Sequence, residues 1–236
     1  YEIGSGLVGS EMCIRDRYKE AGSAENFGEW LDLYHNEKEK RPVCLSEYGG
    51  GGAISQHKDN VDWESDIDPV GVRHYENYQS QLHEILWKQF SVRKYLWAEF
   101  IWCMFDFASY GRTEGDTKSL NDKGLCTRER IPKDVYFFYR SVWSSEKTVY
   151  ITERRHEFRA CDVPFVKVYS NADAVELCIN DVSHGRISRC ELPNDESTVF
   201  VWENIKIKPD TKNKICAKAY FSDGTSRTDY AFWTGK

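Results

Sequence analysis

The chain has 236 residues, of which 40% are hydrophobic and 14% aromatic, and this composition excludes a disordered protein. Its net charge of −6 argues against the clustered basic surface that nucleic acids and anionic membranes require. No stretch reaches the ~18 uninterrupted apolar residues of a membrane span. We therefore expect neither a nucleic acid nor a membrane as a partner.

The first 17 residues, YEIGSGLVGSEMCIRDR, have neither helical nor strand periodicity. They resemble translated adaptor sequence, so we interpret residues 1–17 as a non-native leader and exclude them from the fold. The eight cysteines include no CxxC pair and no histidine at zinc spacing, and they leave the disulfide status open. The acidic residues between 59 and 68 are interpreted as solvated. We predict no metal site and no cofactor.

Helical and strand patterns alternate over residues 18–145, which we take as one domain. An apolar stripe predicts a helix over 23–40, with Ser23 as its cap. A short apolar strand over 43–46 then ends at Glu47, and four glycines and a long polar loop follow.

The pattern continues with a second helix over 72–93, predicted from its apolar period. Residues 95–107 are almost continuously apolar, as in buried parallel strands. Pro132 suits the first turn of a third helix over 131–143. Helices alternating with strands, with long loops after the strands, predict an α/β fold: the last part of a (β/α)8 TIM barrel or a related parallel sheet.

Short alternating runs replace this pattern over residues 146–236, and they predict about seven strands. Val175, Leu177 and Ile179, for example, alternate with less apolar residues, and an Asp-Gly pair at 223–224 predicts a hairpin turn. The pattern is typical of a second, all-β domain: a β-sandwich of the immunoglobulin type.

Glu47 is the first candidate for chemistry, because catalytic groups of TIM barrels lie at the C-terminal ends of strands. The glycines from Gly49 to Gly52 would let the backbone pass close to a ligand. The alternative is an acid that merely ends a strand beside a flexible turn.

Three segments resemble family 2 glycoside hydrolases, especially the β-galactosidases of gut bacteria. They are LSEYGGGG at 45–52, the run from LWAEF to RSVW at 96–143, and VKVYSNADAVELCIND at 166–181. The resemblance covers nearly all of residues 27–236. It implies the end of a catalytic barrel followed by an immunoglobulin-like sandwich.

The resemblance implies that Glu47 is the nucleophile of a retaining exo-β-glycosidase. Retention needs a second carboxyl about 5–5.5 Å away as general acid and base, which the family takes from an Asn-Glu pair far upstream. Here the upstream pair Asn36-Glu37 lies at the charged end of a helix, and we interpret it as solvated. We therefore expect the acid and about six strands to be missing, and the isolated chain to be inactive.

Further substrate-binding residues carry over from the resemblance. Trp102 resembles the aromatic wall of the sugar subsite, or alternatively packs in a core. Asn121 and Lys123 match the Asn-x-Lys pattern with which β-glucuronidases hold a sugar carboxylate by charge-assisted hydrogen bonds. His57 either hydrogen-bonds a sugar hydroxyl or lies in solvent, and Asp106 either braces the site or has no role.

The sandwich favours a β-galactosidase, and the Asn-x-Lys pattern keeps a β-glucuronidase open. A non-catalytic carbohydrate-binding or structural module is the alternative from another class. In each case the expected partner is a β-linked glycoside or oligosaccharide.

Family habit suggests a periplasmic or secreted bacterial enzyme, and a homo-oligomeric full-length parent is left open. Two strands alone would leave unpaired edges, so we expect a loosened barrel part beside a well-formed sandwich.

Overall fold

The computed structural model describes residues 24–38, 40–62, 66, 71–193 and 197–236. The predicted leader and the predicted helix cap Ser23 lie outside these residues. The chain divides into two compact units, which are described separately. The described residues of unit 1 are 24–38, 40–53, 71–74 and 78–131. Those of unit 2 are 54–62, 66, 75–77, 132–193 and 197–236.

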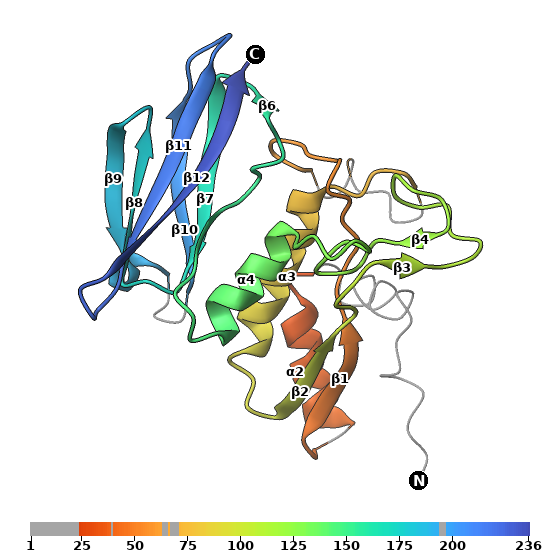
Figure 1. The fold of residues 1–236 in the computed structure, drawn as a ribbon. Coiled ribbons are helices and arrows are strands. Elements are labelled where there is room, and N and C mark those ends of the chain that lie inside the picture. The colour runs from red at the N-terminus through yellow and green to blue at the C-terminus, as the bar shows by residue number, and fades with distance from the viewer. Residues whose placement is uncertain (1–23, 39, 63–65, 67–70, 194–196) are drawn as a thin grey trace. The chain divides into compact units, whose positions relative to one another are not determined.

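Unit 1 contains a pair of parallel strands, β1 (Val43–Tyr48) and β2 (Leu96–Ile101) (Figure 1). Helix α2 (Phe27–Glu37) precedes β1, and helix α3 (Glu76–Phe90) connects the two strands and belongs to unit 1 from Tyr78 onward. The predicted helix, strand, helix and strand are therefore confirmed. Parallel pairing places the C-terminal ends of both strands at the same edge.

The inward face of α3 is more polar than its sequence predicts. Leu82, Leu86 and Phe90 are buried as expected, but Gln79 and His83 are completely buried as well. These two polar residues recur at helical spacing on the inward face. A hydrophobic period could not reveal them, because it counts only apolar positions.

Strand β2 is much less buried than its apolar sequence predicts. Trp97 is 65% exposed and Phe100 is 55% exposed. Among the described residues β2 pairs only with β1, so its second edge has no neighbouring strand. The prediction of a fully buried strand is therefore wrong for the described chain.

A short antiparallel ladder follows β2 in unit 1. Strand β3 (Phe107–Ala108) pairs with β4 (Leu120–Asn121), and Phe107 lies opposite Asn121. This ladder brings the Asn-x-Lys segment back beside the residues that leave β2.

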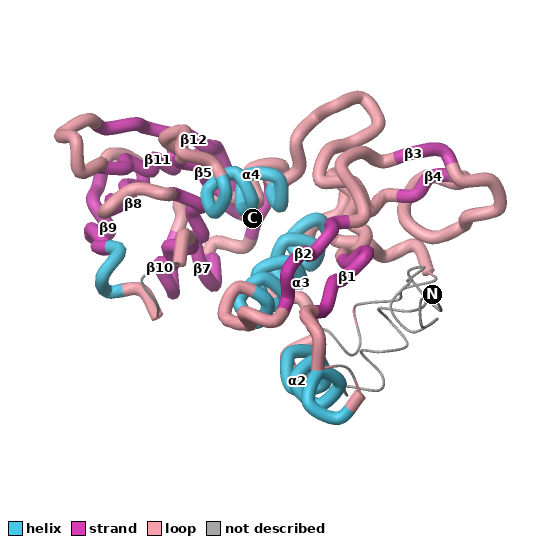
Figure 2. The backbone as a smooth tube through the Cα atoms, turned by 90° about the horizontal axis from the view of Figure 1, so that it is seen from below, coloured by secondary structure: helices cyan, strands magenta, loops and turns pink. Residues whose placement is uncertain are grey.

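Unit 2 contains two sheets that share one hydrophobic core and face each other across it (Figure 2). The smaller sheet has the order β10 (Val199–Lys206), β7 (Asp162–Ser170) and β5 (Val149–Ile151). The larger has the order β6 (Phe158–Arg159), β12 (Ser226–Gly235), β11 (Lys212–Tyr220), β8 (Ala174–Ile179) and β9 (Val182–Ser188). A short 3₁₀ turn, η1 (Arg189–Glu191), follows β9.

The local predictions for the strands hold in unit 2. Val175, Leu177 and Ile179 are buried in the core while the residues between them are half-buried, which confirms the predicted alternation. The predicted hairpin turn joins β11 to β12, and Gly224 adopts φ +79°, which glycine tolerates best. Its amide donates a hydrogen bond of 2.9 Å to the carbonyl of Phe221.

Helix α4 (Asp134–Trp143) belongs to the unit that contains the sheets. Pro132 lies just before the N-cap residue Lys133, so it precedes the first turn of the helix rather than standing in it. The Tyr150 hydroxyl donates to Asp134 at 2.7 Å and ties the helix to β5. The long continuous segment of this unit therefore begins at Pro132, and the domain boundary expected near residue 145 stays a prediction. None of the helices in the described chain is long and apolar enough to cross a membrane.

Candidate active site

Glu47 and Trp102 lie at the same end of the parallel pair in unit 1. Glu47 is the next-to-last residue of β1 and is half-buried, and Trp102 follows β2 directly and is 43% exposed. The Trp102 amide donates to the Tyr48 carbonyl at 2.8 Å, so the two strand ends are hydrogen-bonded to each other. This is the edge at which TIM barrels carry their catalytic groups.

The glycine run after Glu47 lies tightly against other parts of unit 1. A Cβ atom on Gly51 would lie 2.4 Å from Asp122 Oδ1, and one on Gly52 would lie 2.7 Å from Gln79 Cβ. Side chains are excluded here because the backbone packs against α3 and the segment around Asp122. The close approach seen in the structure is thus to the protein itself, whereas the sequence suggested an approach to a ligand.

Gln79 links this glycine run to the Asn-x-Lys segment. It is fully buried, and its Nε2 donates to the Gly50 carbonyl at 2.8 Å and to the Gly124 carbonyl at 3.2 Å. One amide group therefore satisfies two buried carbonyls from segments that are far apart in the sequence.

His74 and Asp122 form a second link. His74 Nδ1 lies 2.8 Å from Asp122 Oδ2, and the two residues are 5% and 4% exposed. The Gly52 amide donates to the Asp122 carbonyl at 3.1 Å, and the Ala53 amide donates to the His74 carbonyl at 2.8 Å. Asp122 is the middle residue of the Asn-x-Lys pattern, so its buried contact with His74 fixes the position of this segment.

The two outer residues of the pattern are also buried. Asn121 and Lys123 are each 3% exposed, and Asn121 Oδ1 accepts a hydrogen bond from the Lys123 amide at 3.1 Å. Asp106 Oδ1 accepts a hydrogen bond from the Gly124 amide at 2.8 Å. Asp106 therefore braces the segment, and a direct contact between Asp106 and a substrate stays a prediction.

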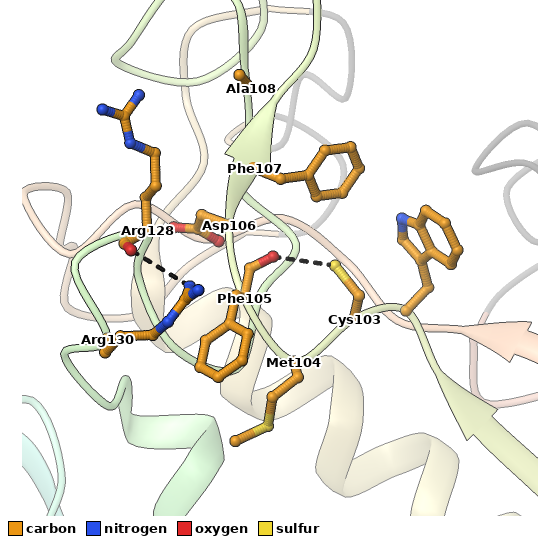
Figure 3. A pocket seen from close by; sticks show the side chains of 9 residues that line it. Cys103, Met104, Phe105, Asp106, Phe107, Ala108, Arg128 and Arg130 are labelled. Atoms are coloured by element: carbon orange, nitrogen blue, oxygen red, sulfur yellow. Dashed lines mark hydrogen bonds between the residues drawn. The ribbon is translucent and has the colours of Figure 1, made fainter.

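A cavity of about 600 Å³ opens beside this edge (Figure 3). The loop from Trp102 to Ala108 lines it, together with Arg128 and Arg130. The Arg130 guanidinium lies 3.7 Å from the centre of the Phe105 ring, a cation–π contact. The cavity brings together two predicted substrate-binding residues, Trp102 and Asp106, and its lining does not include Asn121 or Lys123.

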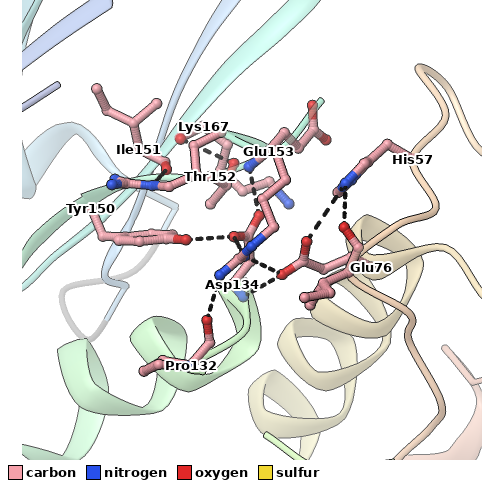
Figure 4. Close-up of polar contacts among 12 residues, drawn as sticks. His57, Glu76, Pro132, Asp134, Tyr150, Ile151, Thr152, Glu153 and Lys167 are labelled. Atoms are coloured by element: carbon pink, nitrogen blue, oxygen red, sulfur yellow. Dashed lines mark hydrogen bonds and ion pairs between the residues drawn. The ribbon is translucent and has the colours of Figure 1, made fainter. Parts of the chain in front are cut away.

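His57 belongs to unit 2. Its Nε2 lies 2.9 Å from the Ile54 carbonyl and 3.9 Å from Glu76 Oε2 (Figure 4). Burial lowers the pKa of His57, so the ring is neutral at pH 7. The side chain is 7% exposed rather than solvated, and its contact with a sugar stays a prediction.

Unit 2 also contains a buried charged network that the sequence did not predict (Figure 4). Arg155 Nη1 lies 2.7 Å from Glu76 Oε1 and 3.5 Å from Asp134 Oδ1. Burial, and then the negative charge of Asp134, raises the pKa of Glu76 to about 8. These residues come from separate segments, so no local pattern could have revealed the network.

Three further side chains in unit 2 have a spacing that suits a metal ion. The ligand atoms of Asp59, Glu153 and His156 all lie within 4.8 Å of one another. However, Arg159, which is 2% exposed, already pairs with both carboxylates, and its Nη2 lies 2.7 Å from Glu153 Oε2. A guanidinium thus supplies the positive charge of this cluster, which fits an ion-pair network rather than a metal site.

The upstream Asn-Glu pair lies at a solvent-exposed helix end, as the sequence predicted. Asn36 and Glu37 are exposed at the C-terminal end of α2. They lie on a helix and not at the end of a strand, so they do not match the family's general acid.

Comparison with known sequences shows that the chain is similar to parts of known glycosidases. The family described as "Domain of unknown function (DUF4982)" matches residues 163–227. A β-glucuronidase of Bacteroides fragilis is 35% identical over 180 residues, which are 75% of this chain and 25% of that protein.

Solved structures give the same result. The FMN-binding β-glucuronidase of Faecalibacterium prausnitzii L2-6 superimposes with a TM-score of 0.75 at 32% identity, over 90% of this chain and 30% of that chain. A protein described as a β-galactosidase of Bacteroides fragilis gives a TM-score of 0.80 at 26% identity, over 90% and 31%. The chain thus spans between a quarter and a third of the length of these relatives. With these matches the resemblance predicted from the motifs is confirmed, and the chain fits a part of a family 2 glycoside hydrolase.

Proposed function

We propose that unit 1 carries part of the active site of a retaining β-glycosidase, with Glu47 as the nucleophile. The observation that carries this proposal is the position of Glu47 beside Trp102, at the C-terminal edge of two hydrogen-bonded parallel strands. On this proposal β1 and β2 are the last two strands of a (β/α)8 barrel, and the sheets of unit 2 form an immunoglobulin-like sandwich.

The proposed reaction has two steps. The Glu47 carboxylate attacks the anomeric carbon and forms an ester while the leaving group takes a proton from a second carboxylic acid. Water then cleaves the ester, with that second group acting as base, so the anomeric configuration is retained. We expect the acid to come from residues upstream of this chain, so the chain alone should hydrolyse almost nothing.

The remaining predicted residues have proposed roles around the sugar. Trp102 offers a ring face beside the nucleophile, and Asp106 braces the segment that carries Asn121 and Lys123. A lysine and an amide held in a buried segment form strong charge-assisted hydrogen bonds with a carboxylate. His57 is proposed to bind a sugar hydroxyl.

A glucuronide is the sugar that these observations favour. The Asn-x-Lys pattern suits a uronate, and the relatives at 35% and 32% identity are both named as β-glucuronidases. A galactoside is the second candidate, which the sandwich favours and which the superposition with a β-galactosidase at a TM-score of 0.80 supports.

The test uses the whole enzyme that contains this chain. Treatment with 2-fluoro-β-glucuronide and 2-fluoro-β-galactoside inactivators should trap the ester, and mass spectrometry should find the label on the peptide that contains Glu47. Glu47→Gln should abolish labelling and turnover. A label on any other carboxylate would refute the assignment.

The choice of sugar has its own prediction. Lys123→Met should lower kcat/KM for a glucuronide by about 10- to 150-fold, the value of a hydrogen bond to a charged group, and leave kcat/KM for a galactoside nearly unchanged. Steady-state kinetics with both nitrophenyl glycosides measures this difference. An equal loss for both sugars would contradict a uronate-binding role for Lys123.

A further inference from the structure

Two cysteines lie directly opposite each other in the larger sheet of unit 2. Strands β8 and β11 are antiparallel neighbours (Figure 1), and their register pairs Cys178 with Cys216. Leu177 and Ala217, the next residues, are fully buried in the core. Because side chains alternate along a strand, both thiols project from the opposite face of the sheet. Both are half-buried, and neither is in a disulfide.

The pairing brings the two residues within disulfide range. Directly opposed residues of antiparallel strands have Cα atoms about 4.5 or 5.5 Å apart, and both separations suit a disulfide. Their Cβ atoms are typically about 4.5–5.5 Å apart, slightly more than the usual about 3.5–4.5 Å across a disulfide. Closing the bond therefore requires a small inward movement of the strands, and it should give a bond that is easily reduced.

Two hydroxyl groups flank the pair in the same row of the sheet. The register places Ser183 of β9 opposite Cys178 and Tyr230 of β12 opposite Cys216. The Ser183 and Tyr230 hydroxyls each lower the pKa of the adjacent thiol, and the Ser183 hydroxyl also donates to Glu176 Oε1 at 2.7 Å. Tyr230 is 50% exposed, so small solutes can reach this part of the row.

Nearby charges influence both thiols. Burial and then the Glu176 carboxylate raise the pKa of Cys178, and burial and then Cys178 raise the pKa of Cys216, whereas Lys214 acts in the opposite direction on both. Asp181 adds a further negative charge. The two groups are therefore thiols at neutral pH, and they need alkaline conditions to become nucleophilic thiolates.

We propose that Cys178 and Cys216 form a modification site: a dithiol that a low-molecular-weight disulfide such as oxidised glutathione converts into a cross-strand disulfide. One protein thiolate attacks the small disulfide, forms a mixed disulfide and releases one small thiol. The second thiolate attacks the protein sulfur of the mixed disulfide and releases the other small thiol. The two protein thiols lose two electrons and the small disulfide gains them. The proposal is independent of the glycosidase activity.

The bond would fix β8 to β11. These strands are adjacent in the sheet, but β9, η1 and β10 lie between them in the chain. A crosslink between residues so distant in the sequence constrains the unfolded chain and should stabilise unit 2. The expected change is a rise of about 5 °C in the midpoint of its thermal unfolding.

The test treats the whole chain with oxidised glutathione at alkaline pH, because the pKa values of both thiols are raised. After unfolding without reductant, the titratable thiols should fall from eight to six. Tryptic mapping should find the peptide 168–186 linked to 215–218. A mild dithiol reductant should break the link and reverse the rise in the unfolding midpoint.

Single variants separate this pair from general thiol oxidation. Cys178→Ser and Cys216→Ser should each abolish the linked peptide and the thermal shift. Cys190→Ser removes an exposed cysteine of unit 2 and should leave both unchanged. A mixed disulfide that persists on Cys178 or Cys216, or a link between other cysteines in place of this one, would overturn the proposal.

Discussion

At the scale of single residues, the backbone after Glu47 is shaped by side chains from distant segments. Gln79 donates to Gly50 and Gly124, and the buried His74–Asp122 pair lies against Gly51. These contacts fix the glycine run and the Asn-x-Lys segment relative to each other within unit 1. Preorganisation of this kind is what an active site requires of its supporting residues.

Gly51→Ala tests this arrangement. The new Cβ would lie 2.4 Å from Asp122 Oδ1 and 2.7 Å from His74 Nδ1, so the buried pair must shift. We expect a loss of about 1–3 kcal/mol in the free energy of unfolding of unit 1, measured by urea denaturation.

A matched control is Gly185→Ala. Its Cβ would meet no atom within 4 Å, and its φ of +103° limits the cost to backbone strain of about 1 kcal/mol. A Gly51→Ala protein as stable as the original chain would contradict the tight packing of the glycine run.

At the scale of secondary-structure elements, buried charges connect helix ends to strands in unit 2. Glu76 begins α3 and Asp134 begins α4, and Asp134 accepts a hydrogen bond from Tyr150 of β5. Arg155 lies close to both carboxylates. The Asp134 amide also donates to Glu76 Oε1 at 2.9 Å, so the ends of the two helices are joined directly.

Stability of unit 2 should depend on pH through Glu76. Its pKa is about 8 in the folded chain and 4.5 in the unfolded chain, so the unfolded state loses its proton first as pH rises. The free energy of unfolding should therefore fall by several kcal/mol between about pH 4.5 and pH 8. Glu76→Gln, which cannot ionise, should lack the Glu76 part of this dependence in urea denaturation experiments, while buried Glu153, whose pKa is also raised, keeps its own.

His156 defines the range in which this comparison is clearest. Burial lowers the pKa of His156 from 6.5 to about 4, so its own contribution to stability rises with pH over that interval. Between about pH 6.5 and 8, His156 no longer changes the free energy of unfolding with pH. The fall that Glu76 causes is therefore not offset by His156 in this range. The same slope in the original chain and in Glu76→Gln would contradict the raised pKa of Glu76.

The guanidinium of Arg159 should be essential to the stability of unit 2. It pairs with Glu153 and Asp59 and stacks 4.4 Å from the centre of the Trp233 ring. Arg159→Met would remove this cation from the buried Glu153 and the half-buried Asp59, and we expect a cost of about 3–5 kcal/mol in chemical denaturation. Arg227→Met, at an exposed position on β12, should cost less than about 0.5 kcal/mol. Similar losses for both variants would contradict the network.

At the scale of the whole molecule, the two units differ in how completely their sheets are built. Strand β11 is hydrogen-bonded to β12 on one side and to β8 on the other. Strand β2 is bonded only to β1 within the described chain, and it exposes Trp97 and Phe100. The expectation of a loosened barrel part beside a well-formed sandwich stays a prediction.

Hydrogen exchange measured by mass spectrometry should reveal this contrast. Amides of β11 and β8 should exchange only on global opening of unit 2, because the strands lie inside a five-stranded sheet over a continuous core. Amides of β1 and β2 should exchange faster by orders of magnitude. Equal protection of the two pairs of strands would refute this expectation.

The sequence by itself determined the features that depend on neighbouring residues. Alternation predicted which residues of β8 are buried, an Asp-Gly pair predicted the turn before β12, and an apolar run that stops at Glu47 predicted a carboxylate at a strand end. The motifs also predicted the family. These signals are local because dihedral preferences and side-chain periodicity act over a few residues.

Only the tertiary structure decided what lies against what. The burial of Gln79, the pairing of His74 with Asp122 and the charged network around Arg155 all join segments far apart in the chain. A polar residue gives no periodic signal of its burial, because its burial is tolerated only where a distant partner meets it. The exposure of β2 is likewise set by which strands are present beside it, and its own apolar sequence carries no information about that neighbour.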